Sequence, residues 1–183
     1  PNVTTTSVTC NGACDGIITS VPSGGTGPYN FTLTSNTFTG TVTNSVSATF
    51  NTLCASATAG IYTLSVEGVG GCIRTQTINL IQPNLLTLTA TTTSITCGGG
   101  CNASLVGSAV GGSPAYSYTW STPAPAQFFT PAISGQCVGT YTLNVRDANG
   151  CTSQTIVTVA APSSITIVYH QLLQVVLEDL MVQ

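Results

Sequence analysis

The sequence predicts an all-β protein made of two tandem β-sandwich domains, followed by a C-terminal segment of different character. Similar segments recur along the chain at nearly constant offsets. Within these segments large and small residues alternate with period two between glycine-rich turns, which indicates strands with one buried face. Eight cysteines stand at matching positions of the two copies and indicate disulfide bonds.

The repeat is clearest where its offset is constant. Cys10 returns as Cys97, 87 residues later, and several neighbouring residues return at the same offset. Further on the spacing shortens to 79 residues, which separates Pro83 from Pro162 and indicates shorter loops in the second copy. Each unit of roughly 80 residues has an ordinary size for a small sandwich domain. We expect a first unit over residues 1–83, a second over 84–162 and a terminal segment over 163–183.

Four pairs of segments are predicted strands: GIITSVPSGG and ASLVGSAVGG, PYNFTLTS and AYSYTW, GIYTLSVEG and GTYTLNVRD, and CIRTQTINLIQP and CTSQTIVTVAAP. Threonine and valine predominate, and β-branched residues suit a pleated surface. One buried face of the second pair is expected to contain Tyr29, Phe31 and Leu33 in the first unit, and Tyr116, Tyr118 and Trp120 in the second. Short strands separated by glycine turns predict β-sandwiches of immunoglobulin-like architecture.

Charge and composition exclude several classes of function. Only 4% of the residues are charged, there is no lysine, and the net charge is −3. A chain whose only strong cations are Arg74 and Arg146 cannot neutralise a nucleic-acid backbone. No run of residues is long and apolar enough to predict a membrane span. The only histidine, His170, has no distinguished nucleophile to activate, so we expect neither an enzyme nor a cofactor. Asp147 and Asn149 are predicted to form a turn rather than a calcium site.

The cysteines predict disulfides in an exported protein, because zinc-type C-x-x-C pairs are absent. A chain that begins with proline also leads us to expect a processed protein or a fragment of a longer one. Four cysteines per unit allow three connectivities. We favour bonds between the ends of the first and last strands, and bonds that close loops of about forty residues, each stabilising by roughly 4 kcal/mol. The expected pairs are Cys10–Cys72, Cys14–Cys54, Cys97–Cys151 and Cys101–Cys137.

Each unit resembles an SprB repeat, a module named after a large cell-surface gliding adhesin of Bacteroidota. In the first unit the matching residues are TCNGACDG, GGTGPYNFTL, LCASATAGIYTLSV and GGC; in the second they are GGSPAYSYTW and CVGTYTLNVRDANGC. The resemblance covers roughly residues 1–162. The first unit departs from the pattern, with VEGVGGC where the family has an aspartate and NGC, which predicts different turn chemistry there. The resemblance implies an exported, surface-exposed β-module of adhesins and filaments, without catalytic residues.

After Pro162 a third unit begins with SSITIV, but the sequence then changes to YHQLLQVVLEDLMVQ. Leucine and valine replace threonine and serine, and polar residues recur at helical spacing, which predicts an amphipathic segment too short to be stable alone. We expect this segment to pack on a neighbouring subunit, by strand addition or groove binding, or to fold back on its own domain. The residues expected to make the assembly contact are Ile165, Ile167, Leu173, Val176, Leu177 and Leu180.

We therefore expect an extracellular, cell-surface protein with a structural or adhesive role, forming a filament through its terminal segment. Its partners would be further copies of itself or the flanking repeats of a longer chain. The alternative is a carbohydrate-binding or adhesin module within a longer secreted multidomain protein. Phe128 and Phe129, in the loop PAPAQFFTPA, are the candidate residues for stacking on surface glycans, with packing over the core as their other role.

Overall fold

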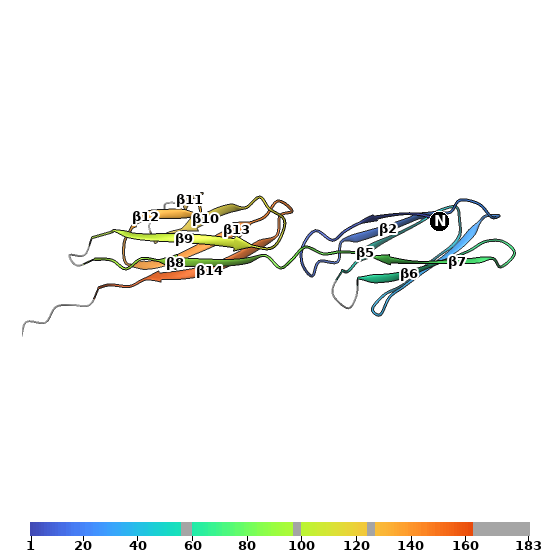
Figure 1. Ribbon diagram of the computed structural model, residues 1–183, viewed down its shortest axis with the longest axis horizontal. Helices are drawn as coiled ribbons and strands as arrows, with labels where there is room; N and C mark the ends of the chain where they lie inside the picture. Colours follow the sequence, from blue (N-terminus) through green and yellow to red (C-terminus); the bar gives the residue numbers. More distant parts are fainter. Residues whose placement is uncertain (56–59, 97–99, 124–126, 163–183) are drawn as a thin grey trace, which may run out of the picture.

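A computed structural model of the chain describes residues 1–55, 60–96, 100–123 and 127–162. These residues form two β-sandwiches that lie end to end (Figure 1) and contain strands but no helix. Repeat 1 denotes the first sandwich, with strands β1 Asn2–Thr6, β2 Gly16–Val21, β3 Tyr29–Thr34, β4 Thr39–Ser45, β5 Ala48–Leu53, β6 Ile61–Glu67 and β7 Ile73–Asn79. Repeat 2 denotes the second, with β8 Thr87–Thr92, β9 Ala103–Val110, β10 Ser117–Ser121, β11 Gln127–Phe128, β12 Ala132–Gln136, β13 Gly139–Arg146 and β14 Thr152–Val159.

The two repeats have the same sheet topology. In repeat 1 the sheet β1-β2-β5 faces the sheet β4-β3-β6-β7, and in repeat 2 the sheet β8-β9-β12 faces β11-β10-β13-β14. All the pairs are antiparallel. This division of seven strands is an immunoglobulin-like arrangement in which the fourth strand pairs with the third instead of joining the first sheet. The predicted fold class is therefore confirmed.

Period-two alternation places the core residues of the central strands. In β6, Tyr62, Leu64 and Val66 are buried, while the residues between them are exposed or half-buried. Strand β13 repeats this pattern with buried Tyr141, Leu143 and Val145. Because successive side chains of a strand point to opposite faces, each strand contributes one apolar face to its sandwich.

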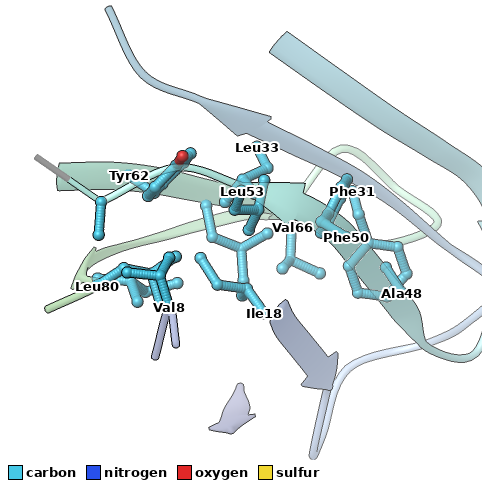
Figure 2. Close-up of a cluster of buried hydrophobic side chains, with 13 residues drawn as sticks. Val8, Ile18, Phe31, Leu33, Ala48, Phe50, Leu53, Tyr62, Val66 and Leu80 are labelled. Atoms are coloured by element: carbon cyan, nitrogen blue, oxygen red, sulfur yellow. The ribbon is translucent and has the colours of Figure 1, made fainter. Parts of the chain in front are cut away.

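Each repeat has a core of its own. In repeat 1, Phe31, Leu33 and Ile18 are fully buried between the two sheets (Figure 2). In repeat 2 the largest buried side chain is Trp120, which occupies the position equivalent to Leu33. The first aromatic residue of each predicted face, Tyr29 in repeat 1 and Tyr116 in repeat 2, is half-buried.

Tyr62 and Tyr141 hold the same position at the start of the sixth strand of each sandwich. The Tyr62 hydroxyl donates a hydrogen bond to the Cys54 carbonyl oxygen at 2.9 Å, and the Tyr141 hydroxyl donates to the Cys137 carbonyl oxygen at 2.8 Å. Such a tyrosine corner, with a hydroxyl bonded to backbone a few residues upstream, is a mark of immunoglobulin-like sandwiches. Burial raises the pKa of Tyr62, so its phenol remains a proton donor.

Four strands were not expected from the sequence: β4, β5, β11 and β12. In β4 and β12 the apolar positions are few, and threonine, serine, glycine and asparagine fill the rest. β11 has only two residues. These strands pair along the edges of the sheets. β4, β11 and β12 bury few side chains, so backbone pairing rather than a strong apolar pattern defines them. β5 buries Ala48, Phe50 and Leu53, but a register shift between Phe50 and Leu53 breaks its period-two spacing.

The disulfides differ from the expected pattern in one respect. The structure contains Cys14–Cys54 and Cys101–Cys137, which the sequence analysis expected. The expected Cys10–Cys72 bond is not formed, because Cys10 bonds to Cys151 of repeat 2 and leaves Cys72 free and exposed. The expected Cys97–Cys151 bond is excluded for the same reason, and Cys97 itself lies outside the described residues. The expected pairs were wrong here because they assumed that each repeat forms its disulfides only within itself.

Candidate functional site at the junction between the repeats

The turn between β13 and β14 is organised by one carboxylate. Asp147 Oδ2 accepts a hydrogen bond from the Ser113 amide at 2.8 Å. Its Oδ1 accepts hydrogen bonds from the amides of Asn149 at 3.0 Å and Cys151 at 2.9 Å. The hydrogen bond from Ser113 first, followed by those from the turn itself, holds the pKa of Asp147 below its usual range. The DANG turn predicted from the sequence is thus held by these three hydrogen bonds, which fix the position of the cysteine that follows it.

Cys151 joins this turn to repeat 1. Its sulfur is bonded to that of Cys10, across a sequence separation of 141 residues and a Cα–Cα distance of 5.7 Å. Beside the bond, the Asn149 side-chain amide donates a hydrogen bond to the Thr9 carbonyl oxygen at 2.9 Å. The turn of repeat 2 therefore contacts the loop between β1 and β2 of repeat 1 through one covalent and one hydrogen bond.

The same loop of repeat 1 also contacts the linker between the repeats, which comprises residues 80–86 between β7 and β8. The Asn11 side-chain amide donates a hydrogen bond to the Pro83 carbonyl oxygen at 3.0 Å. The Gly12 amide donates to the Gln82 side-chain oxygen at 2.9 Å. Because the linker is attached at several points, it cannot act as a free hinge.

Asp15 supports the loop from within repeat 1. Its carboxylate accepts hydrogen bonds from the hydroxyl and the amide of Thr9, the residue whose carbonyl receives Asn149. These bonds, that of the hydroxyl first, lower the pKa of Asp15. In repeat 2 a neutral residue, Asn102, holds this position: its side-chain oxygen accepts from the Thr96 amide, and its side-chain amide donates to the Thr96 hydroxyl.

The end of the linker is seated on repeat 2. The Gly112 amide donates a hydrogen bond to the Asn84 carbonyl oxygen at 2.8 Å, and the Leu86 side chain is buried. Gly111 is required here for two reasons: its φ is +81°, and a Cβ atom would clash with the Leu85 carbonyl oxygen. The paired glycines that the sequence marked as a turn thus also make room for the linker.

The candidate glycan-stacking residues lie elsewhere on repeat 2. Phe128 is in the edge strand β11 and lines a surface groove of about 300 Å³ together with Pro123 and Tyr141. Phe129 follows it and is 72% exposed, so it does not cover the core. These two side chains therefore differ in their surroundings, and only Phe129 offers a largely free aromatic face.

The remaining predicted residues are not placed by the structure. Ile165, Ile167, Leu173, Val176, Leu177, Leu180 and His170 lie outside the described residues. Within the described ranges there is no group of three or more His, Cys, Asp or Glu residues that could hold a metal ion. None of the described residues forms a helix long and apolar enough to cross a membrane.

Comparison with known proteins supports the sequence prediction. The family SprB repeat matches the chain twice, at residues 2–38 and 89–125, which confirms the resemblance and its two copies. A solved structure, that of the amphioxus IgVJ-C2 molecule, is similar over 83% of this chain and 99% of that chain, with 12% identity and a TM-score of 0.41. No curated protein matches the sequence. The SprB repeats and the disulfide-bonded sandwiches indicate an adhesin-type repeat region of the extracellular or cell-surface class.

Proposed function

We propose that this chain, which carries two SprB repeats, is a non-enzymatic structural segment of an extracellular surface protein that resists extension under tension. The two units are residues 1–83 and 84–162. One observation carries the proposal: the disulfide between Cys10 and Cys151 encloses nearly all of both sandwiches in one covalent loop.

The position of this bond determines how tension passes through the chain. A force applied to the two chain ends reaches Cys10, crosses the disulfide and leaves through Cys151. The residues between these cysteines are bypassed and do not lengthen while the bond is intact. At about 3.4 Å per residue, the enclosed chain of 141 residues would have an extended length of about 480 Å, part of which the two other disulfides also hold closed. A surface adhesin needs such a segment to keep its length when its ends are pulled apart.

The composition suits an extracellular surface. With 4% charged residues, the exterior consists mainly of threonine, serine, asparagine and glycine, and it repels neighbouring molecules only weakly. Such a surface allows copies to pack closely. The finer proposal is therefore a filament subunit, assembled through the segment 163–183.

Single-molecule pulling tests the proposed resistance to tension. The unreduced protein should show no unfolding step in which the loop between Cys10 and Cys151 extends. The double variant Cys10→Ser/Cys151→Ser should gain about 200 Å of extension, because the loops of 40 and 36 residues closed by the two other disulfides stay shut. Equal extension of the two proteins would contradict the proposal.

Electron microscopy tests the finer proposal. The unreduced full chain should form filaments, and a chain that ends at Pro162 should remain as single particles. Single particles from both proteins would exclude the filament and leave a segment of a longer adhesin.

Phe129 supports the alternative function of glycan binding, because a largely exposed aromatic ring can stack on a sugar. The variant Phe129→Ala should abolish binding to a glycan array if this function is present. Val46→Ala, which removes an equally exposed apolar side chain from repeat 1, is the matched control. No glycan binding by the unaltered protein would exclude the alternative.

A further inference from the structure

The outer end of repeat 1, which points away from repeat 2 (Figure 1), has the same backbone framework as the junction. The Gly68 amide donates a hydrogen bond to the Cys72 carbonyl oxygen at 3.0 Å, as Asp147 does to Cys151 at 3.0 Å in repeat 2. The Gly71 amide donates to the Gly68 carbonyl oxygen at 3.1 Å, and Gly150 donates to Asp147 at the same distance. The two turns therefore share their backbone hydrogen bonds, although Gly70 has a φ of +101° and its counterpart Asn149 does not have a positive φ.

The loops beside these turns also correspond. The Val69 amide donates a hydrogen bond to the Thr26 carbonyl oxygen at 3.0 Å, and the Ala148 amide donates to that of Ser113 at 3.0 Å. The Tyr29 hydroxyl bonds to the Gly24 carbonyl oxygen, and the Tyr116 hydroxyl bonds to that of Gly111. The surface that receives the linker and Cys10 in repeat 2 is thus reproduced in repeat 1.

The difference lies in what covers the two surfaces. In repeat 2, Leu85 and Leu86 of the linker lie over Gly111 and Gly112. In repeat 1 the equivalent glycines, Gly24 and Gly25, meet no linker, and an open groove of about 590 Å³ is present. The residues lining this groove include Pro1, Gly24, Tyr29, Val66, Val69 and Cys72.

The groove has the properties of an uncovered interface. Val69 and Ile73, which flank Cys72, are 61% and 63% exposed, and the Cys72 thiol is free. The contrast with the junction is clearest at the glycines and the cysteine: Gly24, Gly25 and Cys72 are exposed, whereas Gly111, Gly112 and Cys151 are half-buried. One hydrogen bond of the junction cannot form at this groove. In repeat 2 the Asn149 side chain donates to the Thr9 carbonyl oxygen, but the equivalent residue of repeat 1 is Gly70, which has no side chain.

We propose that this groove binds a further SprB-type repeat that precedes repeat 1 in the same polypeptide. The linker of that repeat would lie over Gly24 and Gly25, and the first cysteine of its C-x-x-x-C loop would form a disulfide with Cys72. Pro1 corresponds by the 87-residue offset to Leu88, two residues after Leu86, and it lines the groove. A linker joined ahead of Pro1 therefore enters the groove in the register seen at the junction.

The bond requires an oxidant. The two thiols lose two protons and two electrons as the sulfur–sulfur bond forms. A disulfide such as oxidised glutathione accepts them and is released as two thiols. The proposal rests on the equivalence of the two surfaces and not on the proposed resistance to tension, so either can fail alone.

A chain with one added repeat tests the proposal. A second copy of residues 1–87 is placed directly before Pro1, so that its Thr87 precedes Pro1 as Thr87 precedes Leu88. The added copy carries Ser7→Thr and Ile73→Val at two exposed positions, so that the peptides containing its Cys10 and Cys72 differ in mass from those of the original repeat 1. After refolding with oxidised and reduced glutathione, the unreduced protein is digested with pepsin and its linked peptides are identified by mass spectrometry. The expected product links Cys10 of the added copy to Cys72 of the original repeat 1. Cys10 linked to Cys72 within the added copy, or left as a thiol, would overturn the proposal.

Amide hydrogen exchange tests the linker contact without the disulfide. The extended chain is prepared with Cys10→Ser in the added copy. In this protein the Gly25 amide of the original repeat 1 should exchange at least about tenfold more slowly than in the chain without the added copy. This amide is the counterpart of Gly112, which donates to Asn84. Gly112 is the internal control and should be protected equally in both proteins. Unchanged exchange at Gly25 would show that the groove does not receive the linker.

Discussion

The turns Gly68–Gly71 of repeat 1 and Asp147–Gly150 of repeat 2 have the same backbone hydrogen bonds but different side chains. Repeat 1 forms the turn with glycine at the first position, so the aspartate is not needed for these hydrogen bonds. In repeat 2 the Asp147 carboxylate bonds three amides, and Asn149 reaches the other repeat. The polar side chains of this turn are thus associated with an occupied junction, while its backbone hydrogen bonds form without them.

The cores of the two repeats also differ in their side chains, although their strands are arranged in the same way. In repeat 1, Phe38 packs edge-on against both Phe50 and Tyr62. In repeat 2 the buried aromatic side chains are Trp120 and Tyr141, with Tyr118 packed against this core. The same topology is thus filled by different sets of side chains, as expected when volume rather than identity determines a core.

Removal of the inter-repeat disulfide should have the largest effect. By the loop-entropy relation, the double variant Cys10→Ser/Cys151→Ser should lower the free energy of unfolding by about 5 kcal/mol, because the bond closes a loop of 141 residues. Cys14→Ser/Cys54→Ser is the matched variant within repeat 1 and should cost about 4 kcal/mol. Denaturant unfolding measures both. A loss for the first pair far below that for the second would contradict a native bond between the repeats.

Truncation of the central core residue should have the next largest effect and should distinguish the repeats. Trp120→Ala should destabilise repeat 2 by about 3–5 kcal/mol, and Leu33→Ala should destabilise repeat 1 by about 2–5 kcal/mol. Both side chains are fully buried. Calorimetry with the inter-repeat disulfide removed should show that each substitution lowers only one of two transitions. A shift of both transitions would mean that the cores are not separate.

The tyrosine corners should contribute equally in the two repeats. Tyr62→Phe and Tyr141→Phe each remove one hydroxyl that bonds to a carbonyl oxygen, and each should cost about 1 kcal/mol. Thermal unfolding of the two variants gives the comparison. An effect in only one repeat would show that the two corners are not equivalent.

The smallest effect concerns pH and only repeat 2. The pKa of Asp147 is lower in the folded protein than in the unfolded chain, so its contribution is fully present above the ordinary aspartate pKa of about 3.9. It is lost as the pH falls through the lower pKa of the folded state. Asp147→Asn offers an amide group to a site surrounded by N–H donors, so repeat 2 should be less stable near pH 7 and should lose less stability on acidification.

Urea unfolding between pH 7 and pH 2 tests this expectation. Repeat 1 is the control, because its own acid sensitivity, which includes the lowered pKa of Asp15, should be the same in the original protein and in the variant. Equal acid sensitivity of the original protein and the variant would contradict the role assigned to Asp147.

Much of the fold could be predicted because both repeats carry strong local patterns. Alternation in GIYTLSV and GTYTLNV identifies the central strands, and GG and DANG identify turns. The edge strands β4, β11 and β12 could not be found, since short polar segments that pair at an edge bury few side chains. β5 was missed for another reason, because a register shift between Phe50 and Leu53 breaks its period-two spacing.

The junction was not predictable for a different reason. The repeat offset shows that Cys10 and Cys97 are equivalent, but not that Cys10 reaches the neighbouring repeat. Asn149 was predicted as a turn residue, and nothing in its local sequence indicates a contact with Thr9, 140 residues earlier in the chain. One signal was present: VEGVGGC lacks the aspartate and asparagine of the second copy, a difference that now coincides with the uncovered end of repeat 1.

Disulfide mapping of the native, unreduced protein tests the central claim most directly. Free thiols are blocked under acidic conditions, the protein is digested with pepsin without reduction, and the linked peptides are identified by mass spectrometry. The account predicts a peptide pair that joins Cys10 to Cys151 and a blocked thiol at Cys72. A pair that joins Cys10 to Cys72 would show that each repeat is closed on itself and would contradict the account.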